Sequence, residues 1–364
     1  MLRTLSSIRT VRAVRASGAG RPARHLRTAR AGLVAGVALA GLLAAPVSAD
    51  AAQPDGDARI QPAPGRYVAL GDSFSSGEGG GRPAPETDTS TNRCHRDARA
   101  YPVRLSRQDR ALRPLTFVAC SGAVTSDLVR NNHLYPSEGP QLAALTASTT
   151  TVTITIGGND AGFAQVLNAC IAVRGLTDGR GCSSNPALTG GVDASLAALA
   201  GRTTPGSPII PVTQVLAQIH ARSPRAHVYV AAYPELFGSR KRDFSRDATA
   251  PSGRACVVNG LAGASFDRTD TRWLNRNTRR LNGVLAQSVR DAKAADRSLR
   301  ATFVRVPAFD GHGLCDARQS WINPLVLAPP TAPGTPPAVD PVSFHPTPKG
   351  QKKGYYRAFR RAGV

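Results

Sequence analysis

Short runs of apolar and β-branched residues alternate along the chain with longer segments whose apolar positions recur at helical spacing. The short runs predict strands at 66–70, 115–119, 151–156, 226–232 and 302–306. The longer segments predict helices near 97–108, 138–148, 187–200, 210–222 and 270–295. In the last of these, Leu274, Leu281 and Leu285 fall on one helical face. This alternation predicts one α/β domain with a parallel sheet covered by helices on both faces.

Two segments interrupt the alternation. Residues 235–268 are polar, and we expect them to form an insertion. Residues 307–340 contain seven prolines and predict an irregular loop. Because a helix-like segment at 343–361 follows, neither resembles a linker, and residues 50–364 are expected to form a single domain.

The first 49 residues have the composition of a secretory signal peptide. They hold eight arginines and no acidic residue, then an apolar run over 31–46, then small residues at 47–49. A membrane anchor is disfavoured because the apolar run is short, and a mitochondrial presequence would not need the cleavage motif. Residues 49–51 offer a second signal-peptidase cleavage site. The leader contains no Arg-Arg pair, which disfavours twin-arginine export. We therefore expect a secreted, extracellular protein.

Composition and charge exclude several classes of protein. Of 364 residues 41% are hydrophobic, which excludes wholesale disorder, and the body lacks the apolar runs of a polytopic membrane protein. Removing the leader leaves 38 basic residues against 24 acidic ones, spread without a basic block. With only 5% aromatic residues, this pattern argues against nucleic-acid binding.

The cysteines indicate disulfides rather than a metal site. An even number in an exported chain predicts three bridges, and 15 connectivities are possible. The spacing contains no C-x-x-C pair, so zinc is not expected. The loop between Cys170 and Cys182 is the shortest to close. The six residues are Cys94, Cys120, Cys170, Cys182, Cys256 and Cys315.

Polar and glycine turns follow the first three predicted strands, at 71–75, 120–123 and 157–160. The carboxyl ends of parallel strands meet at one edge of a sheet, so these turns are expected to converge. Ser73 is the candidate nucleophile, and its own N–H, the N–H of Gly122 and the side-chain amide of Asn159 are candidate oxyanion donors. His345 near the C-terminus is the candidate base.

Each of these features has an ordinary structural explanation when taken alone. Gly-Asp-Ser is a common turn, Asn159 and Asp160 are suited to cap a following helix, and His345 precedes a turn proline. Their occurrence together, in order and after successive strands, favours a catalytic site.

These motifs resemble a known family. GDSF (71–74), CSGA (120–123), GGND (157–160) and SFHPT (343–347) are similar to four sequence blocks of the SGNH hydrolases, also called GDSL lipases and esterases. The run YVALGDSFSSGEG (67–79) resembles most the secreted actinomycete lipase/esterase branch.

The resemblance implies a fold, a site and a disulfide pairing. The fold is a three-layer α/β/α, flavodoxin-like sandwich with five parallel strands. Ser73 would be the nucleophile, His345 the general acid–base, and Gly122 and Asn159 the oxyanion donors beside the Ser73 amide. No metal or organic cofactor is implied, and the fold is sufficient as a monomer. The implied disulfides are Cys94–Cys120, Cys170–Cys182 and Cys256–Cys315.

The chain departs from the family pattern at the acid of the catalytic triad. Many members have an acidic residue three positions before the histidine, where this chain has Val342. Asp340 would reach His345 only if the loop bends. We therefore favour a Ser-His dyad in which a backbone carbonyl, with 321–324 as a possible source, orients the imidazole.

The predicted function is a secreted lipase or carboxylesterase that acts on an ester substrate through an acyl-serine intermediate, without stable membrane insertion. An acetyl esterase for polysaccharides is an alternative, although the few aromatic residues favour lipid or simple esters. A non-catalytic cell-surface binding protein and a serine protease are further alternatives. Asp72 is expected to brace its turn. The remaining histidines of the mature chain are assigned to no site: His95, His133, His220, His227 and His312.

Overall fold

A five-stranded parallel sheet forms the centre of the computed structural model, which describes residues 66–172, 178, 181–202, 206–329 and 338–364. The strand order is β2-β1-β3-β4-β8, and every neighbouring pair is parallel. The predicted α/β fold class is confirmed. The strands are β1 (Tyr67–Gly71), β2 (Leu115–Phe117), β3 (Thr151–Thr155), β4 (His227–Ala231) and β8 (Arg300–Val304).

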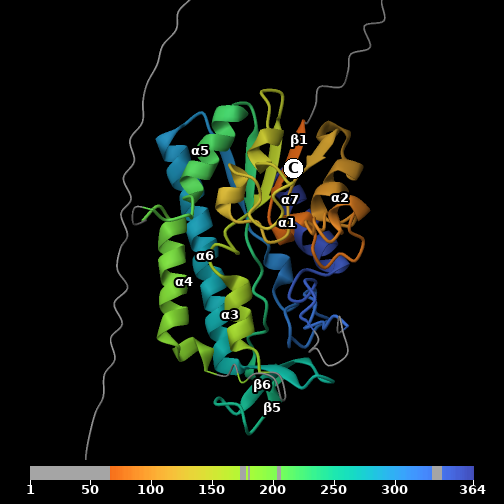
Figure 1. The fold of residues 1–364 in the computed structure, drawn as a ribbon, viewed down its shortest axis with the longest axis vertical. Helices are drawn as coiled ribbons and strands as arrows, with labels where there is room; N and C mark the ends of the chain where they lie inside the picture. Colours follow the sequence, from red (N-terminus) through yellow and green to blue (C-terminus); the bar gives the residue numbers. More distant parts are fainter. Residues whose placement is uncertain (1–65, 173–177, 179–180, 203–205, 330–337) are drawn as a thin grey trace, which may run out of the picture. The chain divides into compact units, whose positions relative to one another are not determined.

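Helices cover both faces of this sheet (Figure 1). One layer contains α3 (Phe163–Cys170), α4 (Pro186–Leu199), α5 (Val212–Arg222) and the long α6 (Arg268–Ala295). The other contains α2 (Tyr101–Gln108), which packs on a π-helical segment (Gly350–Tyr356) that continues into α7 (Arg357–Arg361). The short α1 (Ser73–Ser76) follows β1 directly. Single 3₁₀ turns lie at Pro85–Thr87, Arg110–Leu112, Thr125–Leu128, Gln141–Ala144, Cys182–Ser184, Lys241–Asp243 and Pro307–Phe309.

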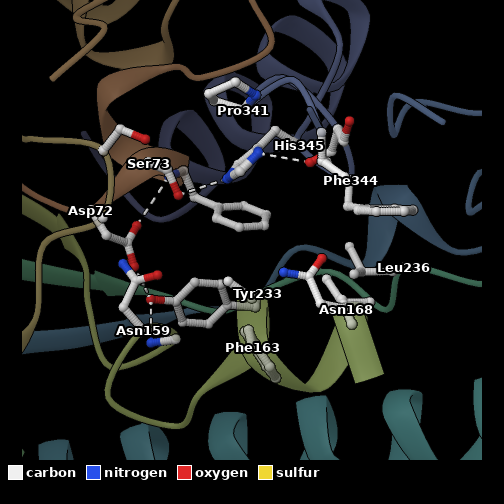
Figure 2. Close-up of a pocket in the computed structure, with 18 of the residues that line it drawn as sticks. Asp72, Ser73, Asn159, Phe163, Asn168, Tyr233, Leu236, Pro341, Phe344 and His345 are labelled. Atoms are coloured by element: carbon white, nitrogen blue, oxygen red, sulfur yellow. Dashed lines mark hydrogen bonds between the residues drawn. The ribbon is translucent and has the colours of Figure 1, made fainter. Parts of the chain in front are cut away.

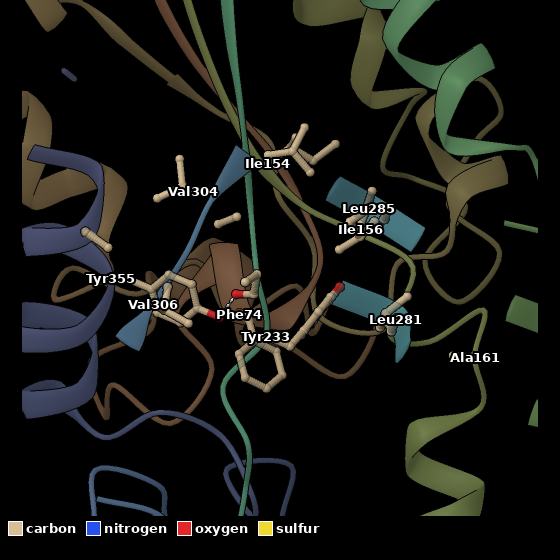
Figure 3. Close-up of a cluster of buried hydrophobic side chains, with 14 of the residues drawn as sticks. Phe74, Ile154, Ile156, Ala161, Tyr233, Leu281, Leu285, Val304, Val306 and Tyr355 are labelled. Carbon is tan, nitrogen blue, oxygen red and sulfur yellow. Dashed lines mark hydrogen bonds between the residues drawn. The ribbon is translucent and has the colours of Figure 1, made fainter. Parts of the chain in front are cut away.

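The hydrophobic core lies on both sides of the sheet. Figure 3 shows Leu281 and Leu285 of α6 beside Ile156 on one side, and Tyr355 with Val304 on the other. All of these side chains are buried. The strands therefore carry nearly continuous apolar runs, as expected for a parallel sheet covered on both faces.

One of the predicted helices is wrong. The segment 138–148 forms no α-helix, only the 3₁₀ turn Gln141–Ala144. Pro140 precedes this turn and disfavours helical backbone in the residue before it. The Gln141 side chain instead bonds the backbone of Gly71, accepting from its N–H at 2.7 Å and donating to its carbonyl at 2.9 Å. The segment thus holds the end of β1.

The predicted insertion at 235–268 carries regular structure that its polar composition did not indicate. It contains a three-stranded antiparallel sheet, β5 (Ser245–Arg246), β6 (Arg254–Asn259) and β7 (Ala264–Asp267). The described part of 307–340 is irregular apart from the 3₁₀ turn Pro307–Phe309, as predicted.

The six cysteines form the three bridges that the resemblance implies. Cys94–Cys120, Cys170–Cys182 and Cys256–Cys315 have Cα–Cα distances of 4.0, 5.0 and 5.7 Å. Within the described ranges, no helix is long and apolar enough to span a bilayer. The predicted signal peptide lies outside the described residues.

Candidate active site

Ser73 lies at the carboxyl end of β1, on the first turn of α1. Asp72 caps this helix by accepting a hydrogen bond from the Phe74 N–H at 3.0 Å. Gly71 has φ +120°, and a Cβ there would lie 2.3 Å from the Thr155 carbonyl oxygen, so only glycine allows the chain to turn this close to β3. The turn leaves Ser73 only 5% exposed, and Ser73 lines a cavity.

His345 reaches Ser73 from the opposite end of the chain. Its Nε2 lies 2.8 Å from Ser73 Oγ, and its Nδ1 lies 3.0 Å from the Ser343 carbonyl oxygen (Figure 2). Phe344, between these two residues, has φ +63°, and this left-handed turn folds the loop back so that the carbonyl faces the ring. The predicted pairing of serine, histidine and a backbone carbonyl is therefore present.

The predicted source of that carbonyl is wrong. It comes from Ser343, two residues before the histidine, and not from 321–324. That segment contacts the main chain instead, because the Asn323 N–H donates to the His345 carbonyl at 2.8 Å. Asp340 accepts from the Val342 N–H at 2.9 Å, so it stabilises its own turn.

The environment of His345 favours the neutral ring. Burial lowers its pKa below the usual histidine value, against the opposing effects of the Glu78 charge and the Ser343 carbonyl. Since that carbonyl can only accept, the ring proton is assigned to Nδ1. Nε2 then presents its lone pair to the Ser73 hydroxyl, as a general base requires.

Gly122 and Asn159 line the same cavity as Ser73, so the structure brings together all four predicted site residues. The Asn159 amide donates one N–H to the Ala123 carbonyl at 2.9 Å, which orients the amide and leaves its second N–H for another acceptor. Asp160 accepts from the Thr125 hydroxyl at 2.6 Å, which joins the loop after β3 to the loop after β2.

Asp72 is more deeply embedded than sequence reasoning indicated. Besides the Phe74 N–H, it accepts hydrogen bonds from the Thr155 hydroxyl at 2.7 Å and from the Tyr233 hydroxyl. Burial raises its pKa to about 6. Tyr233 was not predicted, although it follows β4 as the predicted residues follow β1, β2 and β3.

An apolar cavity of about 310 Å³ opens beside the Ser73 hydroxyl. Phe163 and Leu167 of α3 line it together with Leu236 and Phe344. Figure 2 shows Phe163, Leu236 and Phe344 around the cavity. The α3 helix was not predicted, although the apolar positions in 163–170 have helical spacing. The cavity suits a hydrocarbon chain next to the reacting atoms.

Each of the five other histidines in the described residues bonds a neighbouring group. His95 bonds Glu78, His133 bonds Asp127, His220 bonds Ser298, His227 bonds Thr302, and His312 bonds the Gln319 carbonyl. In the part of the chain that the structure describes, no group of three His, Cys, Asp or Glu side chains is arranged to hold a metal ion.

Known proteins are similar to this chain over most of its length. The model of the GDSL-like Lipase/Acylhydrolase family matches residues 69–353. A lipase of Streptomyces rimosus is 31% identical over 291 residues, which is 79% of this chain and 83% of the relative. Lipase 1 of Streptomyces coelicolor is 32% identical over 326 residues, which is 89% of this chain and 92% of the relative.

Solved structures are similar over the same region. The extracellular lipase of Streptomyces rimosus (26% identity) and phospholipase A1 of Streptomyces albidoflavus NA297 (28%) each have a TM-score of 0.55. Each comparison covers 81% of this chain and 98% of the other.

Proposed function

This chain belongs to the GDSL-like lipase/acylhydrolase family, and from that premise we propose that it is a secreted serine ester hydrolase that works through an acyl-serine intermediate. The observation that carries the proposal is the 2.8 Å contact between His345 Nε2 and Ser73 Oγ, beside Gly122 and Asn159. The relatives named lipase and phospholipase A1 support ester hydrolysis, and the relative described as extracellular supports secretion.

Acylation begins when His345 removes the Ser73 proton and Ser73 Oγ attacks the ester carbonyl. The carbonyl oxygen becomes an oxyanion that accepts hydrogen bonds from the Ser73 and Gly122 N–H groups and the second N–H of Asn159. These donors line a mostly apolar cavity, where such hydrogen bonds act more strongly than in bulk water. His345 then protonates the leaving alcohol.

Deacylation repeats these steps with water in place of the serine hydroxyl. His345 takes a proton from the water, the resulting nucleophile attacks the acyl-serine, and Ser73 leaves with the proton that His345 returns. The Ser343 carbonyl holds the ring through Nδ1 in both half-reactions, so the same nitrogen, Nε2, exchanges every proton.

The apolar wall formed by Phe163, Leu167, Leu236 and Phe344 supports an acyl chain as the group bound next to Ser73. Each buried methylene contributes about 0.8 kcal/mol, or about fourfold in kcat/KM. We therefore expect kcat/KM to rise with acyl-chain length until the cavity is filled.

Hydrolysis of p-nitrophenyl esters from acetate to palmitate by the purified mature protein tests the proposal. Ser73→Ala should abolish turnover, while Ser76→Ala, in the same helix, should retain it. Turnover that survives in Ser73→Ala contradicts the acyl-serine mechanism. Absence of turnover at every chain length, with folded protein and formed disulfides, contradicts the simple-ester function. A kcat/KM that is highest for the acetate ester contradicts the assignment of the cavity to an acyl chain and favours an acetyl esterase.

A further inference from the structure

Glu78 is a buried acidic residue next to the site, and the mechanism above does not use it. It is only 3% exposed, in the loop that follows α1. This loop packs directly on the histidine loop. A Cβ built on Gly79 would lie 3.1 Å from His345 Cβ, and the Gly79 carbonyl accepts a hydrogen bond from the Asn323 amide at 3.2 Å.

Specific partners hold the Glu78 carboxylate in this position. His95 Nδ1 lies 2.6 Å from Glu78 Oε2, and the Ser121 hydroxyl donates to the same carboxylate. His95 has φ +47°, a backbone conformation that few residues other than glycine adopt. A buried carboxylate is costly unless it is paired, and His95 and Ser121 supply the partners that keep this one in place.

We propose that Glu78 is a positioning residue that stabilises the protonated His345 ring through its charge, and that His95 sets how much of this charge the ring experiences. The inference rests on the proposed function. In a Ser-His-Asp triad an acid bonded to the ring both orients it and stabilises the imidazolium. Here the neutral Ser343 carbonyl performs the first task. Glu78 performs the second from the loop that packs on the histidine loop.

The charges of these groups are consistent with that division. Burial raises the pKa of Glu78, but the hydrogen bond from His95 and the nearby His345 and His95 charges outweigh it, so the pKa lies below its usual value. Glu78 is therefore ionised at neutral pH. The same hydrogen bond raises the pKa of His95, and a protonated His95 opposes the effect of Glu78 on His345.

Other charged and titratable groups border this network. His95 Nε2 lies 3.3 Å from the half-exposed Asp88, and Arg93 opposes the protonation of His95. The Glu78 charge also acts on Asp97 and Tyr135. Among these groups, Glu78 and His95 act on His345 directly and with opposite sign.

Two substitutions therefore have opposite effects on the acidic limb of the kcat/KM profile. Glu78→Gln removes the negative charge, which should move the midpoint of the acidic limb to lower pH by about one unit. The pH-independent kcat/KM should fall about tenfold, because the same charge interaction stabilises the protonated ring in the transition state. His95→Gln keeps a donor to Glu78 but cannot become positive, so the limb should move to higher pH. Glu138→Gln is the matched control, because the same change is made at a carboxylate that Arg96 neutralises.

The experiment compares pH profiles of these variants with their melting temperatures and with fluorophosphonate labelling of Ser73, which counts intact sites. In a Ser73→Ala background, proton NMR titration of the His345 ring reports the same shifts without turnover. Opposite shifts support the proposal. No shift, or shifts in the same direction, in folded variants overturn it. If Glu78→Gln fails to fold, His95→Gln and its ring titration decide the question. Absence of hydrolysis by the wild type would contradict the proposed function, while the ring titration would still decide the charge coupling.

Discussion

Replacing Asn159 with alanine tests the oxyanion site most directly. The Asn159 amide uses one N–H to bind the Ala123 carbonyl at 2.9 Å, and the proposed mechanism assigns the other to the oxyanion. The substitution removes both hydrogen bonds, but each contributes to a different measured quantity. The first contributes to the free energy of unfolding, and the second exists only when the oxyanion forms.

The two losses have different expected sizes. Losing one oxyanion donor lowers kcat by about 10²–10³, or about 3–4 kcal/mol in the activation free energy. Because this N–H bonds the oxyanion rather than the carbonyl oxygen of the bound ester, KM should change little. The lost bond to Ala123 should cost about 1 kcal/mol in the free energy of unfolding, which lowers Tm by a few degrees.

The assay measures kcat and KM on a p-nitrophenyl ester together with Tm. Asn168→Ala is the matched control, since Asn168 is exposed on α3 and lines the same cavity away from Ser73 (Figure 2). It should change kcat by less than about threefold, because exposed side chains contribute little. The reasoning is refuted if folded Asn159→Ala keeps more than about a tenth of the wild-type kcat, or if its defect lies only in KM.

Three further predictions follow from the same structure. Because burial lowers the pKa of His345, kcat/KM should remain constant from neutral pH down to the usual histidine value of about 6.5 and decline only below it; a midpoint above that value would contradict the assignment. Burial raises the pKa of Asp72 to about 6, so its proton is held more tightly in the folded state and stability falls as pH rises through this range. The free energy of unfolding of wild type relative to Asp72→Asn should decrease by about 2 kcal/mol between about pH 4 and pH 7 in urea titrations, and a pH-independent difference would rule this out. Replacing Cys256 and Cys315 together by serine opens a bridge with a sequence separation of 59, which should cost about 4 kcal/mol in the free energy of unfolding; a loss below about 1 kcal/mol would show that other contacts hold this loop.

Much of the site was predictable because of how parallel sheets are built. Buried strands need continuous apolar runs, and their carboxyl ends lie at one edge, so residues after successive strands are neighbours. Ser73, Gly122 and Asn159 were found in this way, each in a short motif after a strand.

The parts that sequence reasoning missed are contacts between loops that are distant in the chain. Tyr233 reaches Asp72 across 161 positions, and nothing in the residues around Tyr233 indicates that partner. The carbonyl that orients His345 belongs to Ser343 because Phe344 adopts a left-handed conformation, which no residue preference of phenylalanine predicts.

The sequence by itself determined the α/β class, the strands and the identity of the candidate site residues, because local periodicity and short motifs encode burial and turn chemistry. Only the tertiary structure decided the partners of those groups: the Ser343 carbonyl behind His345, the apolar wall of α3, and the Glu78 carboxylate beside the histidine loop. The physical reason is that hydrogen bonding and electrostatic interaction depend on distance in space, and the packing of loops brings together residues whose separation in sequence carries no such information.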